Sequence, residues 1–226
     1  MEKLLRKILI KFPALLGAEA TRILDAAIHE NYFKRASCYP EHPHYAYWER
    51  QADFWYNSAC PVRPSKVDIG IYRDFLKRKG QKTRILILGS TPEVRDLVSE
   101  EPDAKIYVAD FSYSMPAAML KFTRNVDPLR EKWIKDNWLE LPFPPKFFDV
   151  VLGDVVLHQV TPDLEPTFLG KIWSLLKDDG FFITRLFFLN ENFLQKDLND
   201  ITAQILTGSF TYKQKLTLLK LQTVWL

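Results

Sequence analysis

The chain has 226 residues, of which 47% are hydrophobic and 26% charged, as is typical of one globular domain with its own core. Its formal net charge of +3 is too small, and its basic residues are too scattered, to indicate a nucleic-acid-binding protein. Two cysteines, Cys38 and Cys60, form neither a CxxC pair nor a disulfide framework. We therefore expect both thiols to stay reduced, in the cytoplasm.

The N-terminal segment MEKLLRKILIKFPALLG has apolar residues at helical spacing, but Arg6, Lys7 and Lys11 interrupt them. We therefore expect an amphipathic helix here and neither a signal peptide nor a membrane span. Helical periodicity without convincing strands continues to Gly80 and includes an aromatic-rich stretch. The sequence thus predicts an N-terminal helical region over residues 1–80.

From residue 84 onward, short apolar runs alternate with amphipathic stretches. We predict strands over 84–89, 104–110, 131–136, 147–154 and 181–188, and helices over 92–101, 113–123 and 164–180. Strands that alternate with helices imply a mainly parallel sheet with helices on both faces, and right-handed crossovers then require a doubly wound, Rossmann-like α/β fold. We assign this domain to residues 81–226.

The first strand leads through RILILGSTPEVRDL into a helix, which is where such a fold binds a nucleotide-like cofactor. Gly89 is its only glycine, whereas a phosphate-cradling loop carries two or three. The stretch is thus a degenerate dinucleotide site, a site for another cofactor, or a plain strand-helix corner.

Aspartates follow three of the predicted strands, namely Asp110, Asp136 and Asp154. Asp110 lies 21 residues after Gly89 (110 − 89), where a carboxylate can accept hydrogen bonds from both hydroxyls of an adenosine ribose; alternatively, it caps the next helix. Asp136 can accept from an adenine amino group while the Trp138 ring covers the base. These carboxylates predict a site for an adenosine-containing cofactor at the carboxyl ends of the strands.

The ordered motifs ILILGSTPE, IYVADFSYSM, IKDNWLELPF and FDVVLGDVVLHQV, followed by LEPTFLGKIWSLLKDDGFFIT, carry a family resemblance. Residues 60–190 resemble the class I S-adenosylmethionine-dependent methyltransferases, and the LGSTPE form resembles a subgroup with a Gly-x-Thr-Pro-Glu corner. The resemblance implies S-adenosyl-L-methionine as cofactor. It assigns these residues to the cofactor site: Arg63, Gly89, Ser90, Thr91, Glu93, Asp110, Phe111, Asp136, Asn137, Trp138 and Asp154.

The same resemblance explains the single glycine. A pyrophosphate requires close backbone approach along its length, whereas S-adenosylmethionine presents a ribose and an amino-acid end. Thr91 and Pro92 then fit the N-cap and the first residue of a helix whose free amides can face the methionyl carboxylate.

The chain also departs from the family pattern. Ile87 stands where an acidic residue usually helps to hold the cofactor's ammonium, which leaves Glu93 or a carbonyl near Gly89 as candidates for that contact. Arg63 is either a bidentate partner of the methionyl carboxylate or an arginine in a surface turn.

Methyl transfer from a sulfonium is an in-line displacement, so the main requirement is alignment of a nucleophile with the methyl group. His158 is the candidate base if the acceptor must lose a proton, and Asp154 lines the site beside it; a structural histidine is the alternative. The resemblance implies that the N-terminal helical region covers the active site. Its aromatic residues either line an acceptor pocket or belong to a helical core, namely Tyr45, Tyr47, Trp48, Trp55 and Tyr56. An aromatic pocket favours a small-molecule acceptor, and we assign no metal ligands.

Family members usually add two strands after the fifth, but the segment after 188 has a mostly helical pattern. We therefore expect the final strands to be either absent or truncated. We expect the edge of the fifth strand to be covered by the C-terminal segment, another copy of the chain or a partner, because a bare apolar edge promotes aggregation. Two other functions stay open: a non-catalytic methyltransferase-like subunit or binding module, and, less favoured, a nucleotide-dependent oxidoreductase.

Overall fold

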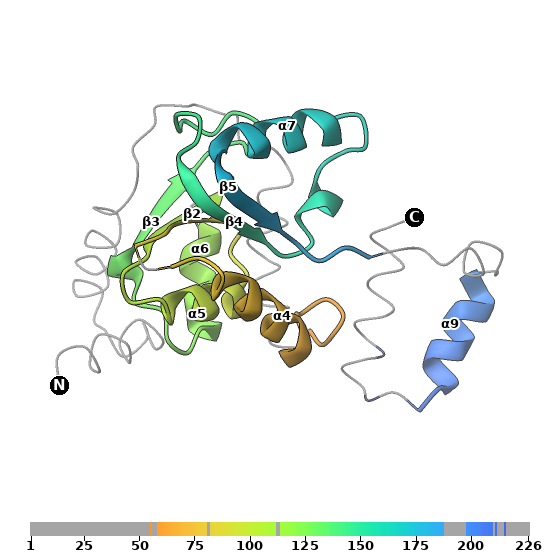
Figure 1. The fold of residues 1–226 in the computed structure, drawn as a ribbon. Coiled ribbons are helices and arrows are strands. Elements are labelled where there is room, and N and C mark those ends of the chain that lie inside the picture. Colours follow the sequence, from red (N-terminus) through yellow and green to blue (C-terminus); the bar gives the residue numbers. More distant parts are fainter. Residues whose placement is uncertain are drawn as a thin grey trace.

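A computed structural model describes residues 58–80, 82–111, 114–187 and 198–209, together with Trp55, Thr211 and Lys215. These residues contain a five-stranded sheet with helices on both faces (Figure 1). The strands are β1 (Arg84–Leu88), β2 (Lys105–Asp110), β3 (Glu131–Lys135), β4 (Phe148–Gly153) and β5 (Leu176–Ile183). The α-helices are α4 (Lys66–Leu76), α5 (Pro92–Ser99), α6 (Ser114–Met119), α7 (Glu165–Leu175) and α9 (Leu198–Thr207). Short 3-10 turns are η2 (Leu120–Phe122), η3 (Pro128–Arg130) and η4 (Val156–Gln159).

The sheet has the strand order β3-β2-β1-β4-β5, and every neighbouring pair is parallel. The chain moves outward from β1 to β3 and then crosses back to β4 on the other side of β1. The strand order therefore reverses between β1 and β4, which is where doubly wound folds bind ligands. The predicted Rossmann-like α/β class is confirmed.

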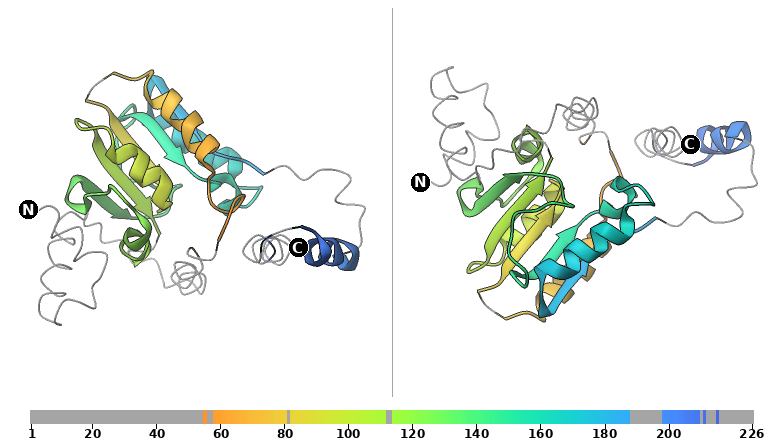
Figure 2. Two further views of the ribbon diagram at one scale, coloured as in Figure 1. Left: turned by 90° about the horizontal axis from the view of Figure 1, so that it is seen from below. Right: turned by 90° about the horizontal axis from the view of Figure 1, so that it is seen from above.

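Alternate residues of β1 pack into the two halves of the core. Ile85 and Ile87 join a cluster with residues of α4 and α5, whereas Leu86 and Leu88 join one with residues of α7. The views in Figures 1 and 2 agree that α4 and α5 cover one face of the sheet and α7 the other. Because β1 is buried on both faces, its sequence is a continuous apolar run.

The predicted boundary between the last helix and strand is wrong. Helix α7 ends at Leu175, five residues before Gly180, and β5 covers Leu176–Ile183 instead of 181–188. Leu176 already pairs with Phe148, and the register then shifts before Val150, so the strand accommodates a polar stretch that resembles a helix end in sequence. Gly180 lies at this irregularity, where a Cβ would lie 3.0 Å from the carbonyl oxygen of Lys177.

Among the described residues no strand follows β5, so β5 is an edge strand of this part of the chain. What covers that edge stays a prediction, as does the division into regions 1–80 and 81–226. Most of the first region lies outside the described residues. Within the described part, no helix is long and apolar enough to cross a bilayer.

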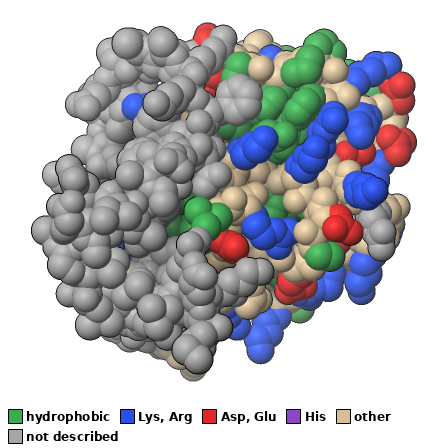
Figure 3. Space-filling view, turned by 90° about the vertical axis from the view of Figure 1, so that its left-hand side faces the viewer, with side chains coloured by type: hydrophobic (Ala, Val, Ile, Leu, Met, Phe, Trp, Pro, Cys, Tyr) green, Lys and Arg blue, Asp and Glu red, His purple; other side chains and the backbone are tan. Residues whose placement is uncertain are grey.

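Basic side chains lie beside hydrophobic ones on the face of the molecule shown in Figure 3. Two such contacts involve strand residues: the Arg84 guanidinium lies 4.5 Å from the Phe147 ring centroid, and the Lys132 ammonium 5.4 Å from that of Tyr107. The long basic side chains thus cover aromatic rings while their charged ends remain close to solvent.

A fully buried ion pair joins α5 to β3. Arg95 donates from Nε and Nη2 to the two carboxylate oxygens of Glu131 at 2.9 and 2.5 Å, and both side chains are 0% exposed. Arg95 also donates to the Pro116 carbonyl in α6, and the Trp133 indole N–H donates to Glu131. These bonds compensate for removing both charges from water.

We predict that Arg95→Met lowers the free energy of unfolding by about 3–5 kcal/mol, because it leaves the Glu131 carboxylate buried without its charge partner. The matched control is Arg73→Met, which breaks the exposed pair with Glu100 and should cost about 0–1 kcal/mol. Urea unfolding of both variants measures the difference, and equal losses would contradict this account of the buried pair.

Candidate functional site

The predicted site residues meet where β1, β2 and β4 end. The register places Leu88 beside Ala109 on one side and beside Gly153 on the other. Main-chain bonding continues past the strands, because the Gly89 N–H donates to the Ala109 carbonyl at 2.8 Å. The carboxyl edge of the sheet therefore presents Gly89, Asp110 and Asp154 side by side.

Gly89 forms the corner between β1 and α5. Its φ of +78° lies in the left-handed region, which glycine adopts without steric cost. Thr91 and Pro92 occupy the predicted N-cap and first helical positions, but within the described part of the chain the Thr91 side chain makes no capping hydrogen bond. The first-turn amides of α5 are thus not capped by Thr91.

Ser90 and Asp110 are joined by a buried hydrogen bond. The Ser90 hydroxyl donates to Oδ2 of Asp110 at 2.7 Å, and both residues are 5% exposed. A serine directly after the glycine therefore holds the carboxylate that we predict to bind a ribose. Phe111 follows directly after β2 and is partly buried.

Trp138 supports the glycine corner from the loop after β3. Its indole N–H donates at 3.0 Å to the Ala109 carbonyl, which also accepts the Gly89 N–H. Its ring packs against Phe168 of α7, with 6.2 Å between centroids. A Cβ at Gly89 would lie 3.9 Å from Cζ2 of Trp138. Trp138 thus has a structural role beside the predicted contact with adenine.

Asp136 and Asn137 are fixed by bonds within the same loop. Asp136 is buried, and its Oδ1 accepts the Asn137 N–H at 2.9 Å. The Asn137 side-chain oxygen accepts the Leu139 N–H at 3.0 Å. The loop therefore holds a carboxylate beside the end of β2, as the adenine prediction requires.

Arg63 and Glu93 form an ion pair at the start of α5. Arg63 donates from Nε at 2.8 Å and from Nη2 to Oε1 of Glu93, and its guanidinium lies 5.6 Å from the Trp55 ring centroid. Among the described residues, the buried side-chain polar atoms without a hydrogen-bond partner are Oε2 of Glu93 and Nε1 of Trp55. The two residues that contact Arg63 thus each carry a buried polar atom without a hydrogen-bond partner, an acceptor on Glu93 and a donor on Trp55.

Asp154 is bound by an arginine that sequence reasoning missed. Arg185 donates from Nε and Nη2 to the two Asp154 oxygens at 2.5 and 2.9 Å, and the Asp154 side chain is 2% exposed. Burial raises the pKa of Asp154, and the hydrogen bonds from Arg185 oppose that rise. The sequence signal was present, since Arg185 is the only charged residue in the run FFITRLFF.

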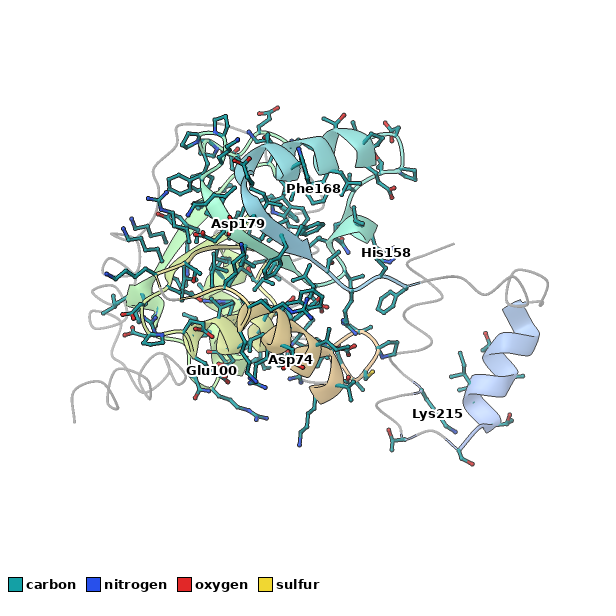
Figure 4. The ribbon with its side chains drawn as sticks, viewed as in Figure 1. Asp74, Glu100, His158, Phe168, Asp179 and Lys215 are labelled. Carbon is teal, nitrogen blue, oxygen red and sulfur yellow. The ribbon has the colours of Figure 1, made fainter. Side chains whose placement is uncertain are left out.

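His158 lies in η4, beside the chain that leaves β5 (Figure 4). Its Nε2 accepts the Phe187 N–H at 2.8 Å, and the two rings stack with 5.5 Å between centroids. Burial lowers the His158 pKa, and the charge of Glu165 opposes this effect. The Nε2 lone pair is therefore engaged within the fold, and a role as catalytic base stays a prediction.

The predicted positions thus form three neighbouring groups. One surrounds Asp110, one is the Arg63–Glu93 pair, and the third is Asp154 with Arg185. Of the aromatic residues proposed for the acceptor pocket, Tyr45, Tyr47, Trp48 and Tyr56 lie outside the described residues. Trp55 is described and packs against Met115 and Met119.

Residues 89–184 match a sequence family described as Methyltransferase domain. The match begins at the glycine corner, ends just after β5 and includes the strand ends that carry Asp110, Asp136 and Asp154. The match agrees with the resemblance that the ordered motifs predict: residues 89–184 are similar to the methyltransferase domain family. No curated protein matches the chain in sequence.

Several solved structures of methyltransferases are similar to this chain. A putative S-adenosylmethionine-dependent methyltransferase from Methanococcus maripaludis is 15% identical, with TM-score 0.49 and coverage of 84% of this chain and 86% of the other. A TehB-like methyltransferase from Corynebacterium glutamicum is 17% identical, with TM-score 0.47 and coverage of 66% and 80%.

Phosphoethanolamine N-methyltransferase 2 from Haemonchus contortus, solved with S-adenosyl-L-methionine, is 20% identical, with TM-score 0.47. The alignment covers 68% of this chain but only 39% of that enzyme. The present chain thus spans about two fifths of the length of that larger protein.

We predict that the pKa of His158 lies below the ordinary value of about 6.5, because burial disfavours the charged ring and because protonation at Nε2 would break its bond with the Phe187 N–H. A depressed pKa in the folded state means that stability is lost as the pH falls through the unfolded-state value toward the folded one. Titration of the ring signals by nuclear magnetic resonance, assigned with His158→Gln, measures the pKa. A value at or above 6.5 would contradict the observed geometry.

Proposed function

We propose that the domain binds S-adenosyl-L-methionine and transfers its methyl group to a small-molecule acceptor. The observation that carries the proposal is the pair of unpartnered buried atoms beside Arg63, Oε2 of Glu93 and Nε1 of Trp55. A buried polar atom without a partner is costly, so such atoms are expected to acquire one from a ligand. The amino-acid end of S-adenosylmethionine offers both an ammonium and a carboxylate.

The charges at the start of α5 fit such a zwitterion. Glu93 has both hydrogen bonds from Arg63 on Oε1, which leaves Oε2 to accept from an ammonium. Arg63, the Trp55 indole N–H and the first-turn amides of α5 are donors for a carboxylate. Glu93 thereby takes the role for which Ile87, fully buried in β1, has no polar group.

The second group of residues fits the adenosine end. Asp110 is oriented by Ser90 at the end of β2, and Asp136 lies beside it because its N–H donates to the Asp110 carbonyl at 3.1 Å. We assign the ribose hydroxyls to Asp110 and the adenine amino group to Asp136. The Asn137 backbone and the Trp138 ring complete the contact with the base.

A sulfonium cofactor supplies an activated methyl group, so the chain's own residues need only bind the cofactor and orient the acceptor. The acceptor approaches from the end of β4, where Asp154 and His158 lie. Both side chains are engaged, one with Arg185 and the other with the Phe187 N–H. This arrangement favours an acceptor whose nucleophilic atom already has a free lone pair at neutral pH.

The hydrogen bonds that occupy Asp154 and His158 also favour a second candidate function. A domain that binds the cofactor without catalysing transfer would need neither a base nor an exposed carboxylate at the end of β4. Such a non-catalytic subunit would keep the Arg63–Glu93 and Asp110 groups. Methyl transfer to any member of a panel of small amines, thiols and hydroxylated aromatic compounds would exclude it.

Isothermal titration calorimetry of the full chain with S-adenosylmethionine tests the proposed function directly. We expect one site and a dissociation constant in the micromolar range, and no binding of NAD or NADP, because the corner at Gly89 lacks the glycines that a pyrophosphate requires. Absence of S-adenosylmethionine binding would reject the proposal.

Two substitutions test the proposed contacts with the two ends of the cofactor separately. Asp110→Ala should weaken binding of S-adenosylmethionine by roughly 1.5–3 kcal/mol, and that of 5′-methylthioadenosine by a similar amount, because both ligands carry the ribose. Glu93→Gln should weaken S-adenosylmethionine alone, by about tenfold or more, since 5′-methylthioadenosine lacks the amino-acid end. Equal losses for both ligands with Glu93→Gln would remove Glu93 from the ammonium contact.

A further inference from the structure

Arg185 links three segments at the carboxyl edge of the sheet. It follows β5 and binds Asp154 after β4 through both carboxylate oxygens. It also donates to the carbonyls of Pro61 and Val62, at 3.0 and 3.3 Å. Its Nη1 lies 3.5 Å from a carboxylate oxygen of Asp68, near the start of α4. Segments more than 120 residues apart in the sequence thus share one guanidinium.

The segment that Arg185 holds after β4 has a strained backbone. Val155 has a φ of 58°, a left-handed conformation that β-branched residues rarely adopt. Gly153, just before it, has no room for a side chain, because a Cβ would lie 2.4 Å from Cγ1 of Val156. Such a conformation persists only where its surroundings over-determine it, and clusters at functional sites.

Two further bonds join the same segments on either side of the ion pair. The Val156 N–H donates to the Thr184 hydroxyl at 3.4 Å, and the Phe187 N–H donates to His158 at 2.8 Å. Residues 184–187 therefore run along residues 154–158, and Arg185 provides the strongest of the three contacts because it is charged and bidentate.

The other end of the Arg185 network reaches the proposed cofactor site. The carbonyls of Pro61 and Val62 directly precede Arg63, which pairs with Glu93 at the start of α5. Tyr72 of α4 adds a bond from its hydroxyl to the Gly153 carbonyl at 3.0 Å. The position of Arg63 is thus coupled to the position of the strained turn through one side chain.

We propose that Arg185 is a positioning residue, which holds the turn at Val155 and the segment before Arg63 in a single arrangement. The link to the cofactor rests on the proposed function, whereas the link between the segments does not. Arg185 thereby holds the turn after β4, where we propose that the acceptor approaches, in a fixed position relative to the Arg63–Glu93 pair, where we propose that the amino-acid end of the cofactor binds. Lysine cannot substitute, because a single ammonium cannot span a bidentate carboxylate and two carbonyls at once.

The test compares Arg185→Lys with Arg73→Lys in the full chain, after circular dichroism has shown that both are folded. Arg73 of α4 is the matched control, because it forms an exposed ion pair with Glu100 at the end of α5, away from the carboxyl edge. Hydrogen exchange and the ring signals of His158 report on the two segments. Calorimetry with S-adenosylmethionine reports on the cofactor.

We expect Arg185→Lys to speed amide exchange in residues 62–63 and 155–158 at least tenfold and to shift the His158 ring signals, with the strands of the sheet unchanged. Affinity for S-adenosylmethionine should fall three- to tenfold. Arg73→Lys should change none of these. A general loss of stability would speed exchange throughout and leave the His158 signals of the folded protein in place.

Wild-type exchange and wild-type His158 signals in a folded Arg185→Lys variant would overturn the proposal. Altered signals with unchanged affinity would overturn its link to the cofactor. If Arg185→Lys does not fold, Asp154→Asn removes the charge pair and should alter exchange in residues 155–158 while residues 62–63 keep theirs. If the wild-type chain binds no S-adenosylmethionine, the proposed function fails, and the exchange data still decide the role of Arg185.

Discussion

The carbonyl of Ala109 fixes the geometry of the carboxyl edge around Gly89. It accepts the N–H of Gly89 and the indole N–H of Trp138, and so joins the end of β2 to the glycine corner and to the loop after β3. The direction in which α5 starts depends on this corner, because Gly89 alone turns the chain. The pair of Arg63 and Glu93, and with it the proposed amino-acid subsite, takes its place from the start of α5.

Each of three carboxylates at this edge accepts a hydrogen bond from a neighbouring side chain. Asp154 is paired with Arg185, Glu93 with Arg63, and Asp110 with the Ser90 hydroxyl. Each carboxylate is thereby held in one orientation, and the desolvation cost of burying it is offset. Among the described residues, only Glu93 keeps a buried side-chain oxygen without a hydrogen-bond partner, which is why we propose that the amino-acid end of the cofactor binds there.

Much of the fold and part of the site could be predicted from sequence. The continuous apolar run of β1, the alternation of strands and helices and the spacing of Asp110 from Gly89 are local signals, and the structure places them as expected. The start of β5 was not predictable from periodicity, because Lys177, Asp178 and Asp179 form a polar stretch that lies between the paired residues Leu176 and Phe181, where the register with β4 shifts.

The hydrogen-bond and ion-pair partners of individual side chains could not be predicted from local sequence patterns either. Arg63 was predicted to contact the cofactor but also pairs with Glu93, thirty residues away in sequence. Asp154 is predicted to line the site, and the sequence did not indicate that its carboxylate is bound by Arg185. Contacts of this kind depend on which strand ends become neighbours, and a sequence pattern does not encode them until the strand order is known.

The two sides of the carboxyl edge are held by different kinds of interaction. Around Gly89 the structure depends on main-chain hydrogen bonds and on a conformation that requires glycine, whereas after β4 it depends on one arginine and the acidic and carbonyl groups around it. Substitutions after β4 that leave Arg185 and its partners in place can therefore change the second side without disturbing the corner at Gly89. Under the proposed function, a lineage that retains this corner could change its acceptor while the contacts with the adenosine end of the cofactor stay the same.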